Sequence, residues 1–122
     1  SKLAGKAAVT VIDFHAEATS EKMAFGWFMN GRVSAVLGTH THIPTADARV
    51  LSKGTAYISD VGMTGPYHSV IGMEVESALP RFLTGLPSRF QTATEDPILC
   101  AVVLDVDESH GQARSIEHIQ VH

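Results

Sequence analysis

Two apolar, β-branched segments flank a stretch long enough for a helix, and this arrangement most restricts the folds that the chain can adopt. Residues 7–14 and 33–38 are almost continuously apolar, which is typical of strands buried on both faces of a sheet. Residues 19–29 between them predict a helix that Thr19 or Ser20 could cap. A strand, a helix and a second strand in this order predict a parallel pair joined by a crossover. The sequence therefore predicts an α/β fold.

The rest of the chain predicts a sheet that is mixed rather than purely parallel. Residues 48–51 and 55–60 flank a short turn and predict a hairpin. Pro80 is expected to kink or restart the next helix. That helix is expected over 75–84, and further strands are expected over 89–93, 98–107 and 113–121. Met23, Trp27 and Phe28 are expected to face the core.

Composition excludes several classes of partner. The chain has 44% hydrophobic and 18% charged residues, as folded proteins do, and a formal charge of −4. No basic field exists to hold a long nucleic acid, although a small phosphorylated substrate is compatible with this charge. No apolar stretch approaches the ~20 residues that span a bilayer. The single cysteine, Cys100, lies in an apolar run and predicts a buried thiol in a reducing, cytoplasmic setting.

Three histidines follow predicted strands, where open α/β sheets bind ligands. His15 ends the first strand, and His40 and His42 follow the second. In an extended segment, residues two apart share a face and lie about 6.6 Å apart. We therefore expect His40 and His42 to project together, with His15 beside them, as a cluster suited to Mn, Fe or Zn.

Other roles for these residues remain open. Each histidine taken singly could be a structural residue that hydrogen-bonds the backbone. The placement of His40 and His42 after a buried strand favours a metal site, and His15 adds to that pair. Asp13 is expected on the same face as His15, where it could orient the imidazole or cap the following turn. The other four histidines are expected at the surface without a specific role: His68, His110, His118 and His122.

A glycine-rich segment forms a second candidate site. Gly62, Met63, Thr64 and Gly65 could direct backbone N–H groups at a substrate phosphate. The segment contains no lysine, so an ordinary turn explains it equally well.

Longer blocks of residues resemble a known family. The blocks are Asp13–Lys22, Gly31–His42, Thr45–Asp47, Asp60–Tyr67 and Arg81–Pro87, and the resemblance extends over nearly all of the chain. They resemble the YmdB-type bacterial metallophosphoesterases of the calcineurin-like superfamily. The resemblance implies an αββα sandwich in which two mixed sheets pack face to face with helices outside.

The resemblance also implies an activity. Members of that family are dinuclear-metal phosphodiesterases that hydrolyse cyclic nucleotides, notably 2′,3′-cyclic ones. The family pattern assigns His15 and His40 to one divalent ion and His42 to the other. Mn, Fe and Zn are all compatible with imidazole ligands.

Family members are roughly twice as long, so the resemblance implies that residues 1–122 are the C-terminal half of one domain. The remaining metal ligands and the general acid are then expected in the N-terminal half. We expect this chain alone to be inactive and to have that half as its partner. Apolar surface left uncovered could also lead to a homo-oligomer.

Two other interpretations stay open. One is a capsule-synthesis-like relative of the metallophosphoesterases, which has a comparable late histidine pair. The other is a metal-binding or regulatory module without catalysis. Residues 16–22 and 62–66 favour the YmdB-type interpretation over the capsule-synthesis-like one.

Overall fold

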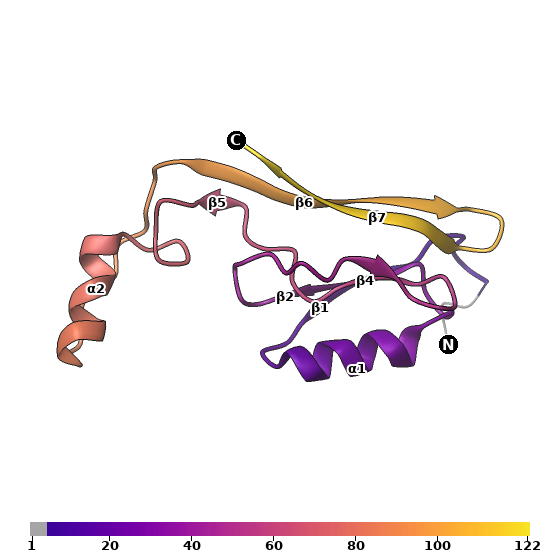
Figure 1. Ribbon diagram of the computed structural model, residues 1–122, viewed down its shortest axis with the longest axis horizontal. Helices are drawn as coiled ribbons and strands as arrows, with labels where there is room; N and C mark the ends of the chain where they lie inside the picture. The colour runs from indigo at the N-terminus through magenta and orange to yellow at the C-terminus, as the bar shows by residue number, and fades with distance from the viewer. Residues whose placement is uncertain (1–4) are drawn as a thin grey trace.

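The computed structural model describes residues 5–122, which form two sheets and two helices (Figure 1). In chain order the elements are β1 (Val11–His15), α1 (Thr19–Met29), β2 (Ala35–Thr39), β3 (Arg49–Val50), β4 (Ala56–Ile58), β5 (Gly65–Pro66), α2 (Val75–Thr84), β6 (Pro97–Asp107) and β7 (Gln112–Val121).

The first sheet is mixed and has the order β1-β2-β4-β3. Strand β2 pairs in parallel with both β1 and β4, whereas β3 and β4 pair antiparallel. The predicted crossover and the predicted hairpin are both confirmed. Because His15 is paired with Thr39 in the parallel register, the ends of β1 and β2 lie side by side.

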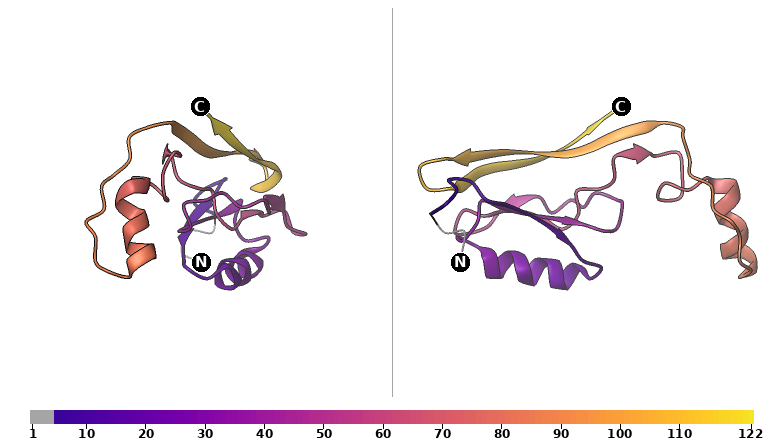
Figure 2. Two further views of the ribbon diagram at one scale, coloured as in Figure 1. Left: turned by 60° about the vertical axis from the view of Figure 1, so that its left-hand side comes forward. Right: turned by 180° about the vertical axis from the view of Figure 1, so that it is seen from behind.

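The second sheet is antiparallel, with the order β5-β6-β7. It packs on one face of the mixed sheet, where Ala35, Ala56 and Ala113 form the buried centre of the contact. Helix α1 covers the opposite face, over a cluster of Val36, Leu51 and Tyr57. Figures 1 and 2 show the resulting order of layers: antiparallel sheet, mixed sheet, helix.

Helix α1 lies close to the sheet because position 26 has no side chain. A Cβ atom on Gly26 would stand 2.5 Å from Cδ2 of Tyr57, too near for the buried ring to remain in place. The same helix buries Lys22, which is 1% exposed. A lysine amine is therefore carried to the face of the sheet, where it needs a partner.

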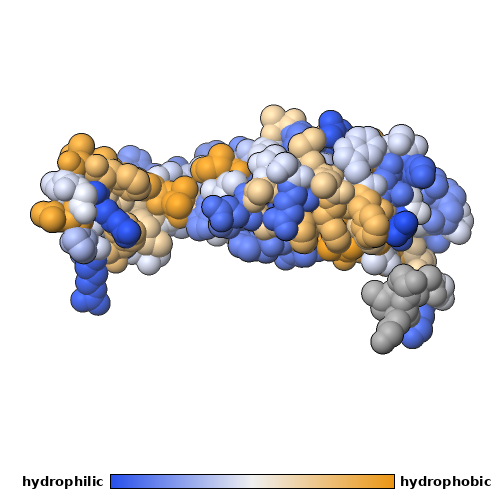
Figure 3. All heavy atoms as spheres, turned by 90° about the horizontal axis from the view of Figure 1, so that it is seen from below, coloured by the Kyte–Doolittle hydropathy of each residue, from blue (hydrophilic) through white to orange (hydrophobic). Residues whose placement is uncertain are grey.

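Helix α2 stands apart from both sheets, beyond one end of the sandwich (Figures 1 and 2). Its apolar side chains are largely uncovered: Phe82 is 75% exposed and Leu83 is 80% exposed. Figure 3 shows apolar residues gathered at this end of the molecule.

Several local predictions are wrong. Strand β1 is an edge strand with alternating exposure, and Val11 is 47% exposed instead of buried on both faces. Met23 does pack on the core, but Trp27 and Phe28 are exposed because α1 presents only one narrow face to the sheet. Helix α1 begins after Ala18 with no side-chain cap.

The predicted strand over 89–93 is also wrong. In the described chain Thr92 makes only an isolated bridge to Met73, since no strand lies alongside this segment. Pro80 lies inside α2, which the structure assigns as one helix. The α/β class is confirmed, with one mixed and one antiparallel sheet. No helix within residues 5–122 has the length and apolar character needed to cross a membrane.

Candidate functional site

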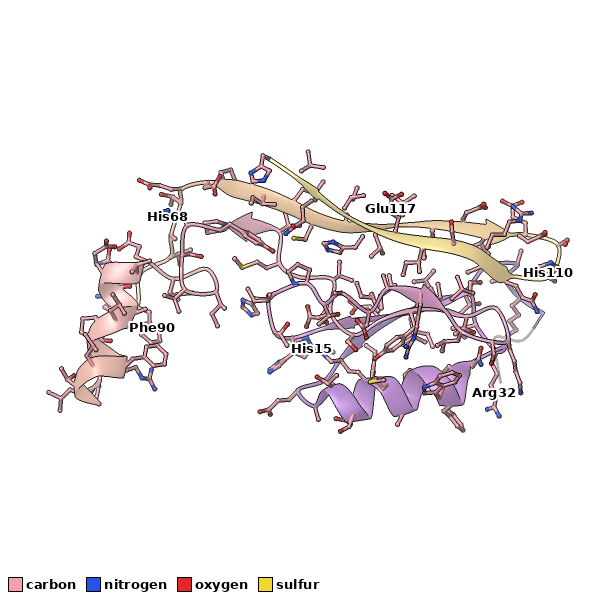
Figure 4. All side chains as sticks on the ribbon, in the orientation of Figure 1. His15, Arg32, His68, Phe90, His110 and Glu117 are labelled. Carbon is pink, nitrogen blue, oxygen red and sulfur yellow. The ribbon has the colours of Figure 1, made fainter. Side chains whose placement is uncertain are left out.

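His15 and His40 face each other where β1 and β2 end. His15 Nε2 lies 3.3 Å from His40 Nδ1, and the two rings meet edge to face at 76°. Both side chains are exposed. Figure 4 places His15 at the end of the sandwich nearer to α2, away from Arg32 and His110. The parallel pairing that the sequence predicted is what brings the two imidazoles together.

Thr39 sets the orientation of the His15 ring. Its hydroxyl lies 3.0 Å from His15 Nδ1 and donates to Asp13 Oδ1 at 3.4 Å. A hydroxyl that donates to the carboxylate is free to accept from the Nδ1–H of the imidazole. In the tautomer that places the proton on Nδ1, the lone pair of His15 lies on Nε2, which faces His40. Asp13 therefore acts on His15 through Thr39.

His42 is held separately. Its Nδ1 lies 3.0 Å from the carbonyl oxygen of Ile71. Because a carbonyl only accepts, Nδ1 carries the proton and the lone pair lies on Nε2. Among residues 5–122, no group of three or more His, Cys, Asp or Glu side chains gathers as a metal cluster. The structure thus brings His15 and His40 together and leaves His42 outside the pair.

The segment that carries His40 and His42 is not extended, so the argument from alternating faces is wrong. His40 has φ of 148° and His42 has φ of 67°, both uncommon for residues with a side chain. Ile71, which contacts His42, has φ of 44°. Backbone in such sparsely populated regions persists only where its surroundings hold it, and it is concentrated at functional sites.

Asp60 binds the backbone of this segment. Nothing in the sequence indicated this role. Its carboxylate accepts the N–H of Thr41 at 2.7 Å and the N–H of Gly62 at 2.9 Å. Lys22 Nζ lies 3.4 Å from Asp60 Oδ2, and both side chains are 1% exposed. A lysine in a predicted amphipathic helix gives no indication of burial, so this ion pair can be found only from the tertiary structure.

Hydrogen bonds lower the pKa of the Asp60 carboxyl. Burial is the strongest single influence and acts to raise that pKa, because desolvation disfavours the charged form. The N–H groups of Thr41 and Gly62, with smaller help from Lys22, outweigh it. The pKa of Asp47 is lowered in the same way, with burial opposed by hydrogen bonds from Ser59 and Thr45.

These two carboxyls predict a loss of stability in acid. Their folded-state pKa values lie below the ordinary 3.8, so their contribution is complete above pH 3.8 and is lost as pH falls through the lowered values. We expect the free energy of unfolding, measured in urea between pH 7 and pH 2.5, to fall steeply below about pH 4. Asp47→Asn should make that fall shallower, and an equal fall in the variant would contradict the assignment.

The glycine-rich segment uses two of its backbone donors within the protein. The N–H of Gly62 binds Asp60, and the N–H of Met63 donates to the carbonyl of His42 at 3.0 Å. Gly65 is paired with Ile98 in the antiparallel sheet. Phosphate binding here stays a prediction, and it cannot rely on the N–H groups of Gly62 and Met63.

His118 is not the free surface residue that the sequence suggested. Its Nε2 lies 2.9 Å from the carbonyl oxygen of Val61, and the contact is partly buried. The imidazole therefore ties β7 to the segment that follows β4. His68 and His110 are exposed, as expected.

The distance between the paired imidazoles suits either a direct hydrogen bond or a shared divalent ion. Two nitrogens bound at ~2.0–2.1 Å to one tetrahedral ion lie roughly 3.4 Å apart. The 3.3 Å between His15 Nε2 and His40 Nδ1 matches that spacing. Thr39 and Ile71 bind the far nitrogens of His15 and His42, as outer partners of metal-binding histidines do.

The chain matches known proteins over almost its whole length. A family described as "YmdB-like protein" matches residues 1–119. A Bacillus subtilis protein named 2′,3′-cyclic-nucleotide 2′-phosphodiesterase is 57% identical over 110 residues, which is 90% of this chain and 42% of that protein.

Two solved structures share the fold. A hypothetical protein from Thermus thermophilus is 50% identical with a TM-score of 0.87, over 93% of this chain and 44% of that one. A structure described as a novel phosphatase from Mycoplasma pneumoniae is 41% identical with a TM-score of 0.88, over 93% of this chain and 41% of that one. The chain thus spans about two-fifths of the length of these relatives.

Proposed function

This chain belongs to the YmdB-like protein family, and on that premise we propose that it supplies the histidine side of a metal-dependent phosphodiesterase site. The resemblance drawn from the residue blocks is confirmed at the level of the family. The observation that carries the proposal is the 3.3 Å approach of His15 Nε2 to His40 Nδ1 at the carboxyl edge of a parallel strand pair.

The residues present have distinct tasks in the proposed site. His15 and His40 would hold one divalent ion, of Mn, Fe or Zn, and His42 would hold a second through Nε2. Thr39 keeps the Nε2 lone pair of His15 directed at His40, and the carbonyl of Ile71 does the same for His42. Bound ions would neutralise charge on the phosphoryl group and activate water for attack on phosphorus.

The proposal extends to the parts that this chain does not contain. We place residues 1–122 as the C-terminal half of an αββα sandwich, completed by the region of the relatives that the chain does not match. That region would provide carboxylate ligands and the general acid. The proposed substrate class is a 2′,3′-cyclic nucleotide, which is what the name of the B. subtilis relative states for that protein.

A chimera tests this function. Residues 1–122 would replace the matching region of the B. subtilis relative, whose 57% identity makes a folded hybrid a fair expectation. The chimera should hydrolyse a 2′,3′-cyclic nucleotide, lose that activity with a chelator and regain it with Mn²⁺. A folded chimera whose hydrolysis resists the chelator would contradict the proposal.

A further inference from the structure

The segment His40–His42 has little regular structure to hold it. It follows β2, has two residues with positive φ, and lies outside the strand ladder. The amide between the two histidines, that of Thr41, donates to Asp60 Oδ2 at 2.7 Å. Asp60 is thus hydrogen-bonded to the backbone between the two histidines.

Asp60 is itself fixed on several sides. Its own N–H donates to Thr45 Oγ1 at 2.9 Å, and its carbonyl accepts the N–H of Thr45 at 3.0 Å. A Cβ atom on Gly38 would collide with the carbonyl of Ser59, so the end of β2 lies directly against the residue before Asp60. The carboxylate therefore has little freedom relative to the end of β2.

The pairing of Asp60 with Lys22 does not by itself explain why charged groups stand here. Both side chains are 1% exposed, and burial of two charges costs desolvation that is offset only where further hydrogen bonds satisfy them. Well-packed apolar residues commonly stabilise a core as well as such a pair does. A carboxylate, however, can accept two backbone N–H groups at once, which an apolar side chain cannot.

We propose that Asp60 is a positioning residue, paired with Lys22, that sets the direction of His40 and His42 through the Thr41 amide. The inference rests on the proposed function, in which these imidazoles hold metal. Loss of the carboxylate should leave the histidines present but misdirected. Removal of such outer partners typically weakens metal binding by about 10–100-fold.

Asp47 provides a matched control. It contacts Ser59, which follows β4, and accepts bonds from the N–H of Ser59 at 3.1 Å, from the hydroxyl of Ser59 at 2.6 Å and from the hydroxyl of Thr45 at 2.6 Å. None of its hydrogen bonds comes from residues 39–43. Asp47 shares Thr45 with the backbone of Asp60, but the bonds from the Asp60 carboxylate to Thr41 and Gly62 do not involve it. Asp47→Asn should therefore reduce stability while leaving the Asp60–Thr41 bond in place.

The test compares Asp60→Asn with Asp47→Asn in the 122-residue chain. Without metal, Asp60→Asn should shift the imidazole NMR signals of His40 and His42 and speed hydrogen exchange at the Thr41 amide, whereas Asp47→Asn should leave them as in the parent. With Co²⁺, followed by its visible absorption, Asp60→Asn should bind at least about tenfold more weakly. If Asp60→Asn does not fold, the double variant Lys22→Met/Asp60→Asn takes its place in the test, because it also removes the buried ammonium that the single variant leaves unpaired.

The inference is overturned if a folded Asp60 variant keeps the parent's imidazole signals and the parent's rate of hydrogen exchange at the Thr41 amide. It is also overturned if Asp47→Asn changes those signals and that rate as much as Asp60→Asn does. The same series separates this result from failure of the proposed function. If His15→Ala and His40→Ala bind Co²⁺ as tightly as the parent does, the proposed metal site is wrong. The imidazole NMR signals recorded without metal still decide the role of Asp60 in that case.

Discussion

Replacing His40 with alanine in the chimera with the B. subtilis relative should lower cyclic-nucleotide hydrolysis by more than roughly 100-fold. Loss of a residue that only hydrogen-bonds a metal ligand can cost that much, and loss of a ligand itself should cost more. His40 Nδ1 stands 3.3 Å from His15 Nε2, so the variant removes one of two nitrogens that face each other. Metal content should fall in parallel. Steady-state kinetics and elemental analysis of the purified variants measure both effects.

His110→Ala is the matched control for this substitution. His110 lies at the opposite end of the sandwich (Figure 4), where its side chain pairs with Asp107 in the turn between β6 and β7. The variant also removes one histidine but should keep the activity and metal content of the chimera. Equal losses in the two variants would refute a special role for His40.

The second large effect concerns the 122-residue chain by itself, which should show no detectable hydrolysis of a 2′,3′-cyclic nucleotide with Mn²⁺, Fe²⁺ or Zn²⁺. In the part that the structure describes, no carboxylate joins the imidazole pair as a third member of a cluster. Two divalent ions ~3.5–4 Å apart repel each other strongly unless anionic ligands bridge them.

Complementation measures this prediction. The unmatched region of the B. subtilis relative would be produced separately and mixed with the chain, and activity is expected only in the mixture. Chelator-sensitive turnover by the chain alone would contradict the assignment of the missing ligands to the other region.

The sequence predicted the site as far as strand topology determines it. Apolar segments around a helix implied parallel pairing, and parallel pairing places the ends of β1 and β2 together. This is why the approach of His15 to His40 could be expected. The short turn between residues 51 and 55 identified the pairing of β3 with β4 in the same way.

The local shape of the site could not be predicted, because distant residues determine it. The turn at His40 and His42 depends on Asp60, which is 19 residues from Thr41, and Asp60 is paired with Lys22, 38 residues away. Neither separation leaves a periodic pattern. The exposure of β1 had a similar cause, since burial of an edge strand depends on its neighbours rather than on its own apolar composition.

We propose above all that His15 and His40 share a divalent ion. Crystals of the 122-residue chain soaked in Mn²⁺ and measured near the manganese absorption edge test it most directly. We expect an anomalous peak between His15 Nε2 and His40 Nδ1, which His40→Ala should abolish. Crystals with ordered manganese only at other positions, and with the two imidazoles still in contact, would contradict it.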